Sequence, residues 1–326
     1  MRIAIVAHSL AHPRQKIFFD HLGTLQDVEL LKIGPLSWGT LKSIEGFPVS
    51  FEGQLANYEF GDDAEKTIAD FNPNVIYCQA EWWSKEANRC ARFAQKIGCK
   101  FVLFVWENMK TPNQDWHKET IKLSDLVICG NNKAREIVAT VGCNTCKLPQ
   151  VGIDTDLFKP MENVPKSWNL IFVGRPVAEK GIDIIQRIAK KRDITLELIS
   201  GVPYEKLPRF YNRGQVFISF SYSVPWWTEQ FAPYASLEAL SCGVPVITSN
   251  SGAIPEWIGG WPGVVMLQEK DEFALEHTLK AIKWEDRHPM LEAREIIVTK
   301  FSKEAVSIYL KEVLRRVEEG EINRKI

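Results

Sequence analysis

A short basic stretch, Gly174–Gly181, combines residue types that bind phosphate. It follows the apolar run Leu170–Val173 and leads into a helical pattern. A glycine lets the backbone approach a ligand, while Arg175 can make paired contacts to phosphate and Lys180 places a charge beside a helix N-terminus. The stretch predicts an anion site. The alternative is an exposed loop whose cations pair with Glu179.

A second segment carries two carboxylates after the apolar run Val216–Phe220. Glu229 precedes a helical pattern, and Glu238 lies within it. Carboxylates accept hydrogen bonds from paired sugar or ribose hydroxyls, so this spacing favours a carbohydrate or nucleoside ligand. The alternative is a helix cap for Glu229 and a solvated helix face for Glu238.

Three further candidates each follow a predicted strand in the first half of the chain. They are His8, Trp82 and Glu107. Histidine can exchange a proton near neutral pH, a tryptophan ring can stack on a sugar, and a carboxylate can act as a base. The alternatives are a structural histidine and a tryptophan packed in the core.

Short apolar runs alternate with amphipathic stretches along the whole chain. Strands are expected at Arg2–Ala7, Glu29–Ile33, Val75–Cys78, Phe101–Val105, Leu126–Cys129, Leu170–Val173, Leu196–Ile199, Val216–Phe220, Val244–Thr248 and Gly263–Leu267. Helices are expected at Pro13–Leu25, Ala64–Asp70, Ser84–Ile97 and Lys133–Val141, with a final helix from about Ser302. This alternation predicts an α/β fold with doubly wound parallel sheets.

The pattern pauses between Pro149 and Trp168, where glycine and proline gather, and then restarts. With about 150 residues per domain, two Rossmann-like domains are expected, at 1–152 and 153–303, followed by a helix at 304–326 that packs back across the junction. Ligands of open parallel sheets bind beyond the carboxyl ends of the strands. The candidates above all follow strands, so we expect a cleft between the two domains to hold the site.

Composition narrows the class of protein. The 326 residues are 45% hydrophobic and carry a net charge of -1, which is typical of a globular protein and disfavours a nucleic-acid partner. The apolar runs are too short to span a membrane, and the first residues enter a strand directly, so a cytoplasmic location is expected. Seven scattered cysteines predict reduced thiols. Motifs of nicotinamide enzymes, P-loop ATPases, zincins and serine hydrolases are absent from the sequence.

Four stretches together resemble the retaining glycosyltransferases of family 4, which have the GT-B fold of two facing Rossmann-like domains. The stretches are Val151–Pro160, Phe172–Gly181, Glu229–Val246 and Gly252–Glu256. They occur in the family's order and cover the second half of the chain densely. The first half matches only in its order of elements, as expected if it handles a variable acceptor.

The resemblance implies a role for each candidate in the second half. Arg175 and Lys180 would bind the donor's diphosphate, and Glu229 would hold the transferred sugar. Gly174, Gly201, Gln230, Phe231, Ala232 and Glu238 would complete the donor site, with Glu238 on the ribose. The donor would be a UDP- or GDP-linked sugar, and transfer would need no metal. Asp154-Thr-Asp156 imitates a metal-binding motif but lies in the family's interdomain stretch, where a turn is expected.

Two departures from the family pattern lie between Glu229 and Glu238. Eight residues separate Glu229 from Glu238 where the family has seven, so either the loop is one residue longer or Gln230 takes the first acidic position. Pro233 removes a backbone amide that could face the donor. A GT-B epimerase or hydrolase and a non-catalytic nucleotide-sugar-binding module therefore remain alternatives. The acceptor is a glycan, a lipid-linked glycan or a small molecule, and a lipid-linked one would imply peripheral membrane contact.

Overall fold

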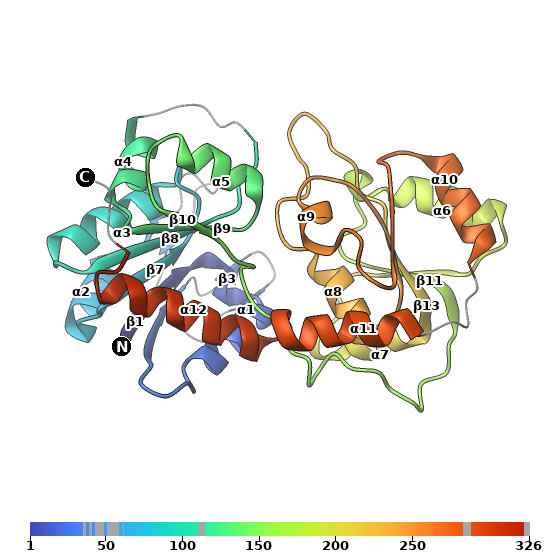
Figure 1. The fold of residues 1–326 in the computed structure, drawn as a ribbon, viewed down its shortest axis with the longest axis horizontal. Helices are drawn as coiled ribbons and strands as arrows, with labels where there is room; N and C mark the ends of the chain where they lie inside the picture. Colours follow the sequence, from blue (N-terminus) through green and yellow to red (C-terminus); the bar gives the residue numbers. More distant parts are fainter. Residues whose placement is uncertain are drawn as a thin grey trace. The chain divides into compact units, whose positions relative to one another are not determined.

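A computed structural model describes residues 1–34, 37–38, 41–42, 49–50, 59–60, 62–109, 115–282 and 288–322 of the chain. It divides into two compact units (Figure 1). Unit 1 comprises Met1–Gly152 and Val306–Ile326, and unit 2 comprises Ile153–Ala305. The greater part of the last helix, α12 (Lys303–Glu318), thus belongs with the first half of the chain.

Unit 1 is built on a six-stranded parallel sheet in the order β10-β9-β8-β7-β1-β2. The strands are β1 (Arg2–Ala7), β2 (Glu29–Ile33), β7 (Val75–Gln79), β8 (Lys100–Val105), β9 (Leu126–Cys129) and β10 (Thr145–Lys147). The helices are η1 (His8–Ala11), α1 (Pro13–Leu22), α2 (Asp62–Phe71), α3 (Lys85–Lys96), α4 (Asp115–Leu123) and α5 (Asn132–Ala139). The strand order reverses between β1 and β7, which is where open parallel sheets bind ligands.

Unit 2 has a five-stranded parallel sheet in the order β12-β11-β13-β14-β15. The strands are β11 (Trp168–Val173), β12 (Leu196–Ile199), β13 (Gly214–Ser219), β14 (Val246–Ser249) and β15 (Val264–Leu267). Around them lie η3 (Ala178–Lys180), α6 (Ile182–Lys191), η4 (Tyr204–Lys206), α7 (Leu207–Arg213), α8 (Tyr234–Ser241), α9 (Ile254–Ile258), α10 (Glu272–Ala281), α11 (His288–Ile296) and the π-helix η5 (Ile297–Phe301). Here the order reverses between β11 and β13.

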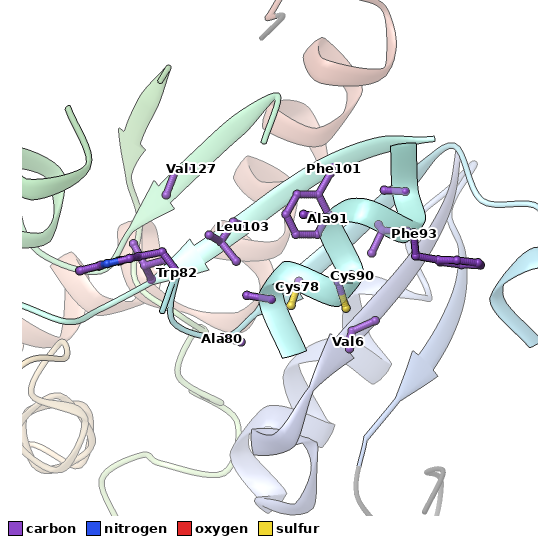
Figure 2. Close-up of a cluster of buried hydrophobic side chains, with 14 of the residues drawn as sticks. Val6, Cys78, Ala80, Trp82, Cys90, Ala91, Phe93, Phe101, Leu103 and Val127 are labelled. Carbon is purple, nitrogen blue, oxygen red and sulfur yellow. The ribbon is translucent and has the colours of Figure 1, made fainter. Parts of the chain in front are cut away.

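The cores follow from the apolar runs. Strands β7 and β8 of unit 1 are buried along nearly their whole length, as expected for parallel strands covered on both faces. Figure 2 shows how Phe101 and Leu103 of β8 pack with Cys78 of β7 and Cys90 of α3. The predicted α/β class with parallel sheets is confirmed.

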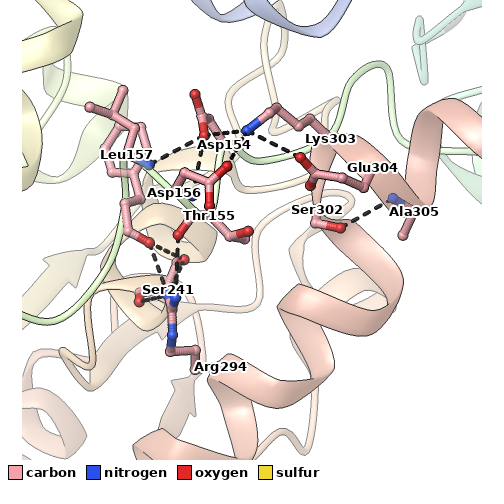
Figure 3. Close-up of polar contacts among 11 residues, drawn as sticks. Asp154, Thr155, Asp156, Leu157, Ser241, Arg294, Ser302, Lys303, Glu304 and Ala305 are labelled. Atoms are coloured by element: carbon pink, nitrogen blue, oxygen red, sulfur yellow. Dashed lines mark hydrogen bonds and ion pairs between the residues drawn. The ribbon is translucent and has the colours of Figure 1, made fainter. Parts of the chain in front are cut away.

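A polar cluster ties the first residues of unit 2 to its last (Figure 3). Lys303 Nζ donates to Asp154 Oδ1 at 2.7 Å and to Asp156 Oδ2 at 2.9 Å. Arg294 bonds the carbonyl oxygens of Phe158 and Thr155 at 2.9 and 3.2 Å. The Asp-Thr-Asp motif therefore binds a lysine of its own unit. In the described residues, no group of three or more acidic, histidine or cysteine side chains could hold a metal ion.

The structure adds elements that the sequence pattern did not predict. Two small antiparallel pairs, β3 (Ser37–Trp38) with β4 (Leu41–Lys42) and β5 (Val49–Ser50) with β6 (Glu59–Phe60), precede α2. They escaped prediction because a two-residue strand shows no periodicity. No helix in the described part of the chain has the length and apolar character needed to cross a membrane. The seven cysteines all lie in the described residues and form no disulfide.

Candidate functional site

The loops that follow β11 and β13 meet at the reversal point of the unit 2 sheet. The loop after β11 contains Gly174, Arg175 and η3, and the loop after β13 runs to Pro233. Because the two strands are paired neighbours, their carboxyl ends place both loops side by side. This brings together the two stretches that the sequence analysis selected.

Lys180 and Glu229 form the centre of this site. Lys180 Nζ donates to Glu229 Oε1 at 2.6 Å, and Ser221 Oγ donates to the same oxygen at 2.6 Å. The ammonium also lies over the ring of Trp227, 4.8 Å from its centroid. The two charged side chains are only 22% and 16% exposed, so their attraction is less screened than at an open surface. Two residues 49 positions apart in sequence are thus brought into direct contact.

Gly181 explains how the two loops come so close. Its φ of +69° lies in the left-handed region, and a Cβ there would stand 2.1 Å from the carbonyl oxygen of Phe220. A second link is the bond from Tyr222 N to Glu179 O, at 2.9 Å. Only glycine allows this approach, which holds Lys180 against the loop that carries Glu229.

Arg175 is exposed beyond the end of β11, with no ion pair to a described residue. The alternative of a basic loop paired to Glu179 does not fit Lys180, whose ion pair is with Glu229. Gly174 donates its amide to Ile199 O at 3.0 Å, which ties the start of the loop to β12. Gly201 is exposed just beyond β12. An exposed guanidinium at this edge can reach a bound anion.

The segment before α8 is irregular. Gln230 and Phe231 are half-buried, and Ala232 is buried. Pro233 is the N-cap residue of α8 and provides no side-chain cap. Glu229 lies four residues earlier and bonds Lys180, so the alternative of Glu229 as a helix cap is wrong.

Glu238 is fully buried on α8. Its two carboxylate oxygens accept hydrogen bonds from Tyr204 Oη at 3.2 Å and Tyr211 Oη at 3.0 Å. The alternative of a solvated helix face is therefore wrong. The expected ribose contact is not supported by this burial, because both oxygens are engaged by tyrosines that the sequence pattern did not connect to it.

The buried carboxylate leads to a prediction on stability. We expect Glu238→Ala to lower the free energy of unfolding by roughly 3 kcal/mol, because two buried tyrosine hydroxyls lose their acceptor. Glu238→Gln, which keeps one acceptor oxygen, should cost less. Urea denaturation measures both. An unchanged urea midpoint in Glu238→Ala, together with weakened nucleotide binding, would instead support a contact between Glu238 and the ribose of the donor.

The candidates of unit 1 are less accessible than expected. Trp82 is 3% exposed and belongs to the hydrophobic core (Figure 2), so its burial does not support stacking on an acceptor sugar. His8 is 8% exposed, and its ring lies 6.0 Å from that of Trp106. Glu107 is half-buried just after β8, and its Oε1 accepts from Met109 N at 2.9 Å. Of the three, Glu107 is the one with a partly exposed polar side chain.

Glu81 is a carboxylate that the sequence analysis passed over. Its Oε1 accepts from Trp106 N at 2.7 Å and from Glu107 N at 2.8 Å, while Oε2 has no hydrogen-bond partner among the described residues. Burial raises the pKa of Glu81 well above its ordinary value, against the two amide bonds, and the charge of Glu107 raises it further. The available signal was its position directly beyond β7, beside the reversal point. Glu81 shapes the turn that presents Glu107.

His8 gives a prediction on pH dependence. Burial lowers the pKa of His8 from 6.5 to about 4. As the pH falls below 6.5, His8 binds a proton in the unfolded chain but stays neutral in the folded chain until about pH 4. Protonation therefore favours the unfolded state, and the stability present above pH 6.5 is lost as the pH falls through 4. We expect this loss to be roughly 3 kcal/mol and to be absent in His8→Gln.

The measurement is urea denaturation of both proteins between pH 7.5 and pH 4. His277→Gln, at an exposed position of unit 2, is the matched control and should follow the unmodified chain. Burial and the charge of Arg14 also lower the pKa of His12 to about 4. Both variants keep His12, so both should keep the part of the pH dependence of stability that comes from it. Equal slopes in all three proteins would contradict the assignment to His8.

Part of the chain is similar to a known protein family. Residues 156–290 match the family described as "Glycosyl transferases group 1". No curated protein matches the sequence. The matched range contains Lys180, Ser221 and Glu229.

Solved structures are similar to nearly the whole chain. HepE from Anabaena in complex with UDP-glucose is 13% identical, with a TM-score of 0.72 over 97% of this chain and 99% of that chain. Sucrose-phosphate synthase from Thermosynechococcus elongatus is 15% identical, with a TM-score of 0.67 over 98% and 100%. AviGT4, a glycosyltransferase involved in avilamycin A biosynthesis, is 15% identical, with a TM-score of 0.64 over 98% of each. At these identities the likeness establishes the fold, which is GT-B.

Proposed function

We propose that this chain, a glycosyltransferase with the GT-B fold, moves a sugar with retention of configuration from a nucleotide diphosphate sugar to an acceptor. The observation that carries the proposal is the contact between Lys180 and Glu229 at the reversal point of the unit 2 sheet. It supports the proposal because the cation proposed to bind the diphosphate lies beside the carboxylate proposed to bind a sugar hydroxyl. A nucleotide sugar offers both groups next to each other.

The contacts of Lys180, Ser221 and Glu229 suit a donor that carries both a diphosphate and a sugar. Lys180 and Ser221 both donate to Oε1 of Glu229, which fixes the carboxylate that is proposed to accept from a sugar hydroxyl. When a diphosphate arrives, Lys180 can turn part of its hydrogen bonding toward it while Ser221 keeps Glu229 in place. Arg175 adds an exposed guanidinium. Negative charge grows on the leaving phosphate as the glycosidic bond breaks, so these cations lower the barrier most where the charge develops.

The nucleotide of the donor is proposed from two sources. The resemblance of the sequence implies UDP or GDP, and HepE, which shares the fold, was solved with UDP and with UDP-glucose. We therefore propose UDP as the first nucleotide to test.

Transfer is proposed to need no metal, because Arg175 and Lys180 supply the positive charge. For the acceptor, Glu107 is the proposed base, with Glu81 holding the turn behind it, and we propose a cytoplasmic location.

A thermal-shift panel tests the proposal. The full chain is heated with UDP, GDP, ADP and their sugar conjugates, beside Arg175→Ala and the matched control Arg209→Ala, an exposed arginine on α7. A ligand at about 100 times its dissociation constant adds ~2.7 kcal/mol of stability. We expect one nucleotide class to stabilise the chain and Arg209→Ala, but Arg175→Ala far less. No shift with any nucleotide would overturn the donor site.

The identity of the products separates the reaction classes. Incubating the stabilising nucleotide sugar without an acceptor and analysing the products by chromatography detects an epimerase or a hydrolase. Slow turnover that an acceptor accelerates is the expected result for a transferase. Binding without turnover under any acceptor would favour the nucleotide-sugar-binding module, for which the longer loop between Glu229 and Glu238 is the supporting observation.

A further inference from the structure

The segment between β13 and α8 carries the most exposed large apolar side chain of the described residues. Trp226 is 77% exposed, whereas Trp227 beside it is half-buried, with its ring centroid 4.8 Å from Lys180 Nζ. A single exposed aromatic residue is common at protein surfaces and by itself indicates no site. Trp226 differs from such a residue in the way the chain holds it.

Trp226 lies at the tip of a tight hairpin. Val224 N donates to Trp227 O at 2.8 Å, and Trp227 N donates to Val224 O at 3.2 Å, so Pro225 and Trp226 alone form the turn. Proline fixes its own φ near the value that the first central position of a common β-turn requires. Both residues of the turn are exposed. The backbone at Trp226 is therefore constrained, although its side chain is mostly in solvent.

Two neighbouring loops hold the base of this hairpin. Ser223 donates from N and from Oγ to Glu269, at 2.8 and 2.7 Å, in the loop after β15. Ser223 Oγ also lies 2.9 Å from Thr228 Oγ1, across the hairpin. Tyr222 N donates to Glu179 O at 2.9 Å, in the loop after β11. Folding the hairpin back over the unit to cover its tip would break these bonds, so the ring stays in solvent until a ligand covers it.

The surroundings of Trp226 suit a sugar ring. A protein or membrane partner needs a contiguous apolar area on the order of several hundred Å², whereas Trp226 offers one ring above polar groups. Those groups are the hydroxyls of Ser223 and Thr228 and the carboxylate of Glu269 at the base of the hairpin. A pyranose ring has a face of C–H groups with hydroxyls around it. It can therefore cover one indole face and keep its hydroxyls in a polar environment.

The difference in exposure along the hairpin indicates which sugar Trp226 meets. Lys180 and Glu229, proposed to hold the diphosphate and the transferred sugar, are 22% and 16% exposed. Trp227 lies against Lys180, and Trp226 is on the solvent side of the same turn. A ring stacked on Trp226 therefore belongs to a molecule that reaches the donor from solution, which is the acceptor.

We propose that Trp226 binds the acceptor by stacking on a pyranose ring, so that the acceptor is a saccharide chain. This inference rests on the proposed sugar transfer, and it narrows the acceptor to one class. An acceptor without a sugar ring would leave the braced indole without a partner. The residue sets specificity for the acceptor and takes no part in breaking the bond to the leaving phosphate.

Affinity electrophoresis of the full chain tests the proposal. The protein runs through native gels containing dextran, laminarin, mannan, galactan or xylan, and the retardation at increasing polysaccharide concentration gives an apparent dissociation constant. Stacking uses the C–H face of a pyranose, so we expect at least one of these polymers to retard the chain. Trp226→Ala should raise that dissociation constant about tenfold or more, as expected for truncating a tryptophan anchor. Trp226→Phe, which keeps an aromatic face, should raise it less.

Phe273→Ala is the matched control, because Phe273 is 76% exposed on α10 of the same unit and lies outside the hairpin. It should be retarded like the unmodified chain. Equal urea midpoints of the variants show that lost retardation is not unfolding. Equal weakening by Trp226→Ala and Phe273→Ala would overturn the proposal, and so would the absence of retardation by all five polymers.

Two further measurements separate other occupants and the donor site. If the chain co-sediments with phosphatidylcholine vesicles through Trp226 but no polysaccharide retards it, a lipid surface replaces the saccharide and the proposal falls. Thermal stabilisation by a nucleotide reports the donor site by itself. Stabilisation without retardation would overturn the role of Trp226 and leave sugar transfer standing. Retardation through Trp226 without any stabilisation would support the saccharide contact but overturn the donor site.

Discussion

Arg175→Ala should lower kcat about 100- to 1000-fold with the assigned donor while leaving the urea midpoint unchanged. The side chain is exposed and makes no ion pair with a described residue, so its loss costs the fold little. Arg175 is proposed to stabilise the transition state. Removing one preorganised hydrogen-bond donor from a developing oxyanion typically lowers kcat by about 100- to 1000-fold. Initial rates of nucleotide release under saturating donor measure the effect.

Two comparisons make the Arg175 result specific. Arg209→Ala removes an exposed arginine of the same unit and should keep full activity. Arg175→Lys retains the charge but loses the planar fork, and should recover only part of the rate. Normal turnover by Arg175→Ala would show that the leaving phosphate is stabilised elsewhere, and the donor site would have to be reassigned.

Gly252→Ala, which replaces a single hydrogen by a methyl group near the site, should lower the turnover number about 100-fold. A Cβ at this position would stand 2.1 Å from Glu229 O, 2.6 Å from Thr228 Oγ1 and 2.8 Å from Glu229 N. The backbone on both sides is held, since Ala253 N donates to Glu229 O at 2.8 Å. The methyl group must push the main chain of Glu229 away and with it the carboxylate that Lys180 bonds. A displacement of about 1 Å at such a group can cost 100-fold in rate.

Gly260→Ala is the matched control for Gly252→Ala. Both glycines have positive φ, +75° at Gly260 and +48° at Gly252, but a Cβ at Gly260 would meet nothing within 4 Å. Gly260→Ala should therefore lose only the ~1–2 kcal/mol that a left-handed alanine costs and keep its turnover number. Urea denaturation and initial rates separate the two contributions. Equal behaviour of the two variants would mean that the contact between Gly252 and Glu229 has no part in the reaction.

Strand position was the informative signal in the sequence. Glu229 and Lys180 were selected because each follows an apolar run that ends at the same edge of a parallel sheet, and the pairing of β11 with β13 does bring them together. The fold class was predictable for the same reason, since apolar runs and amphipathic stretches alternate throughout the chain. The predicted helix bounds differed from the observed ones in both directions: Pro13–Leu25 was too long for α1 (Pro13–Leu22), and Ala64–Asp70 was too short for α2 (Asp62–Phe71).

Burial was the property that the sequence could not supply. A glutamate within a helical pattern is expected on the exposed face of the helix. Glu238 is instead buried, and Tyr204 and Tyr211 from another part of the unit donate hydrogen bonds to it. Trp82 was expected at a ligand surface, but the strands beside it fill its surroundings with apolar side chains. Glu81 was overlooked because its role depends on two backbone amides 25 and 26 positions away. Each of these depends on which segments meet in space, which periodicity does not encode.

The ion pair between Lys180 and Glu229 also governs how quickly a charged donor finds its site. An ammonium with a carboxylate oxygen at 2.6 Å projects little net field into solution, so Lys180 carries its own counter-ion until a ligand displaces it. Long-range steering of a diphosphate toward unit 2 then falls to Arg175, whose charge is exposed. The association rate should consequently respond to ionic strength as though one site cation were present, although two take part once the complex has formed.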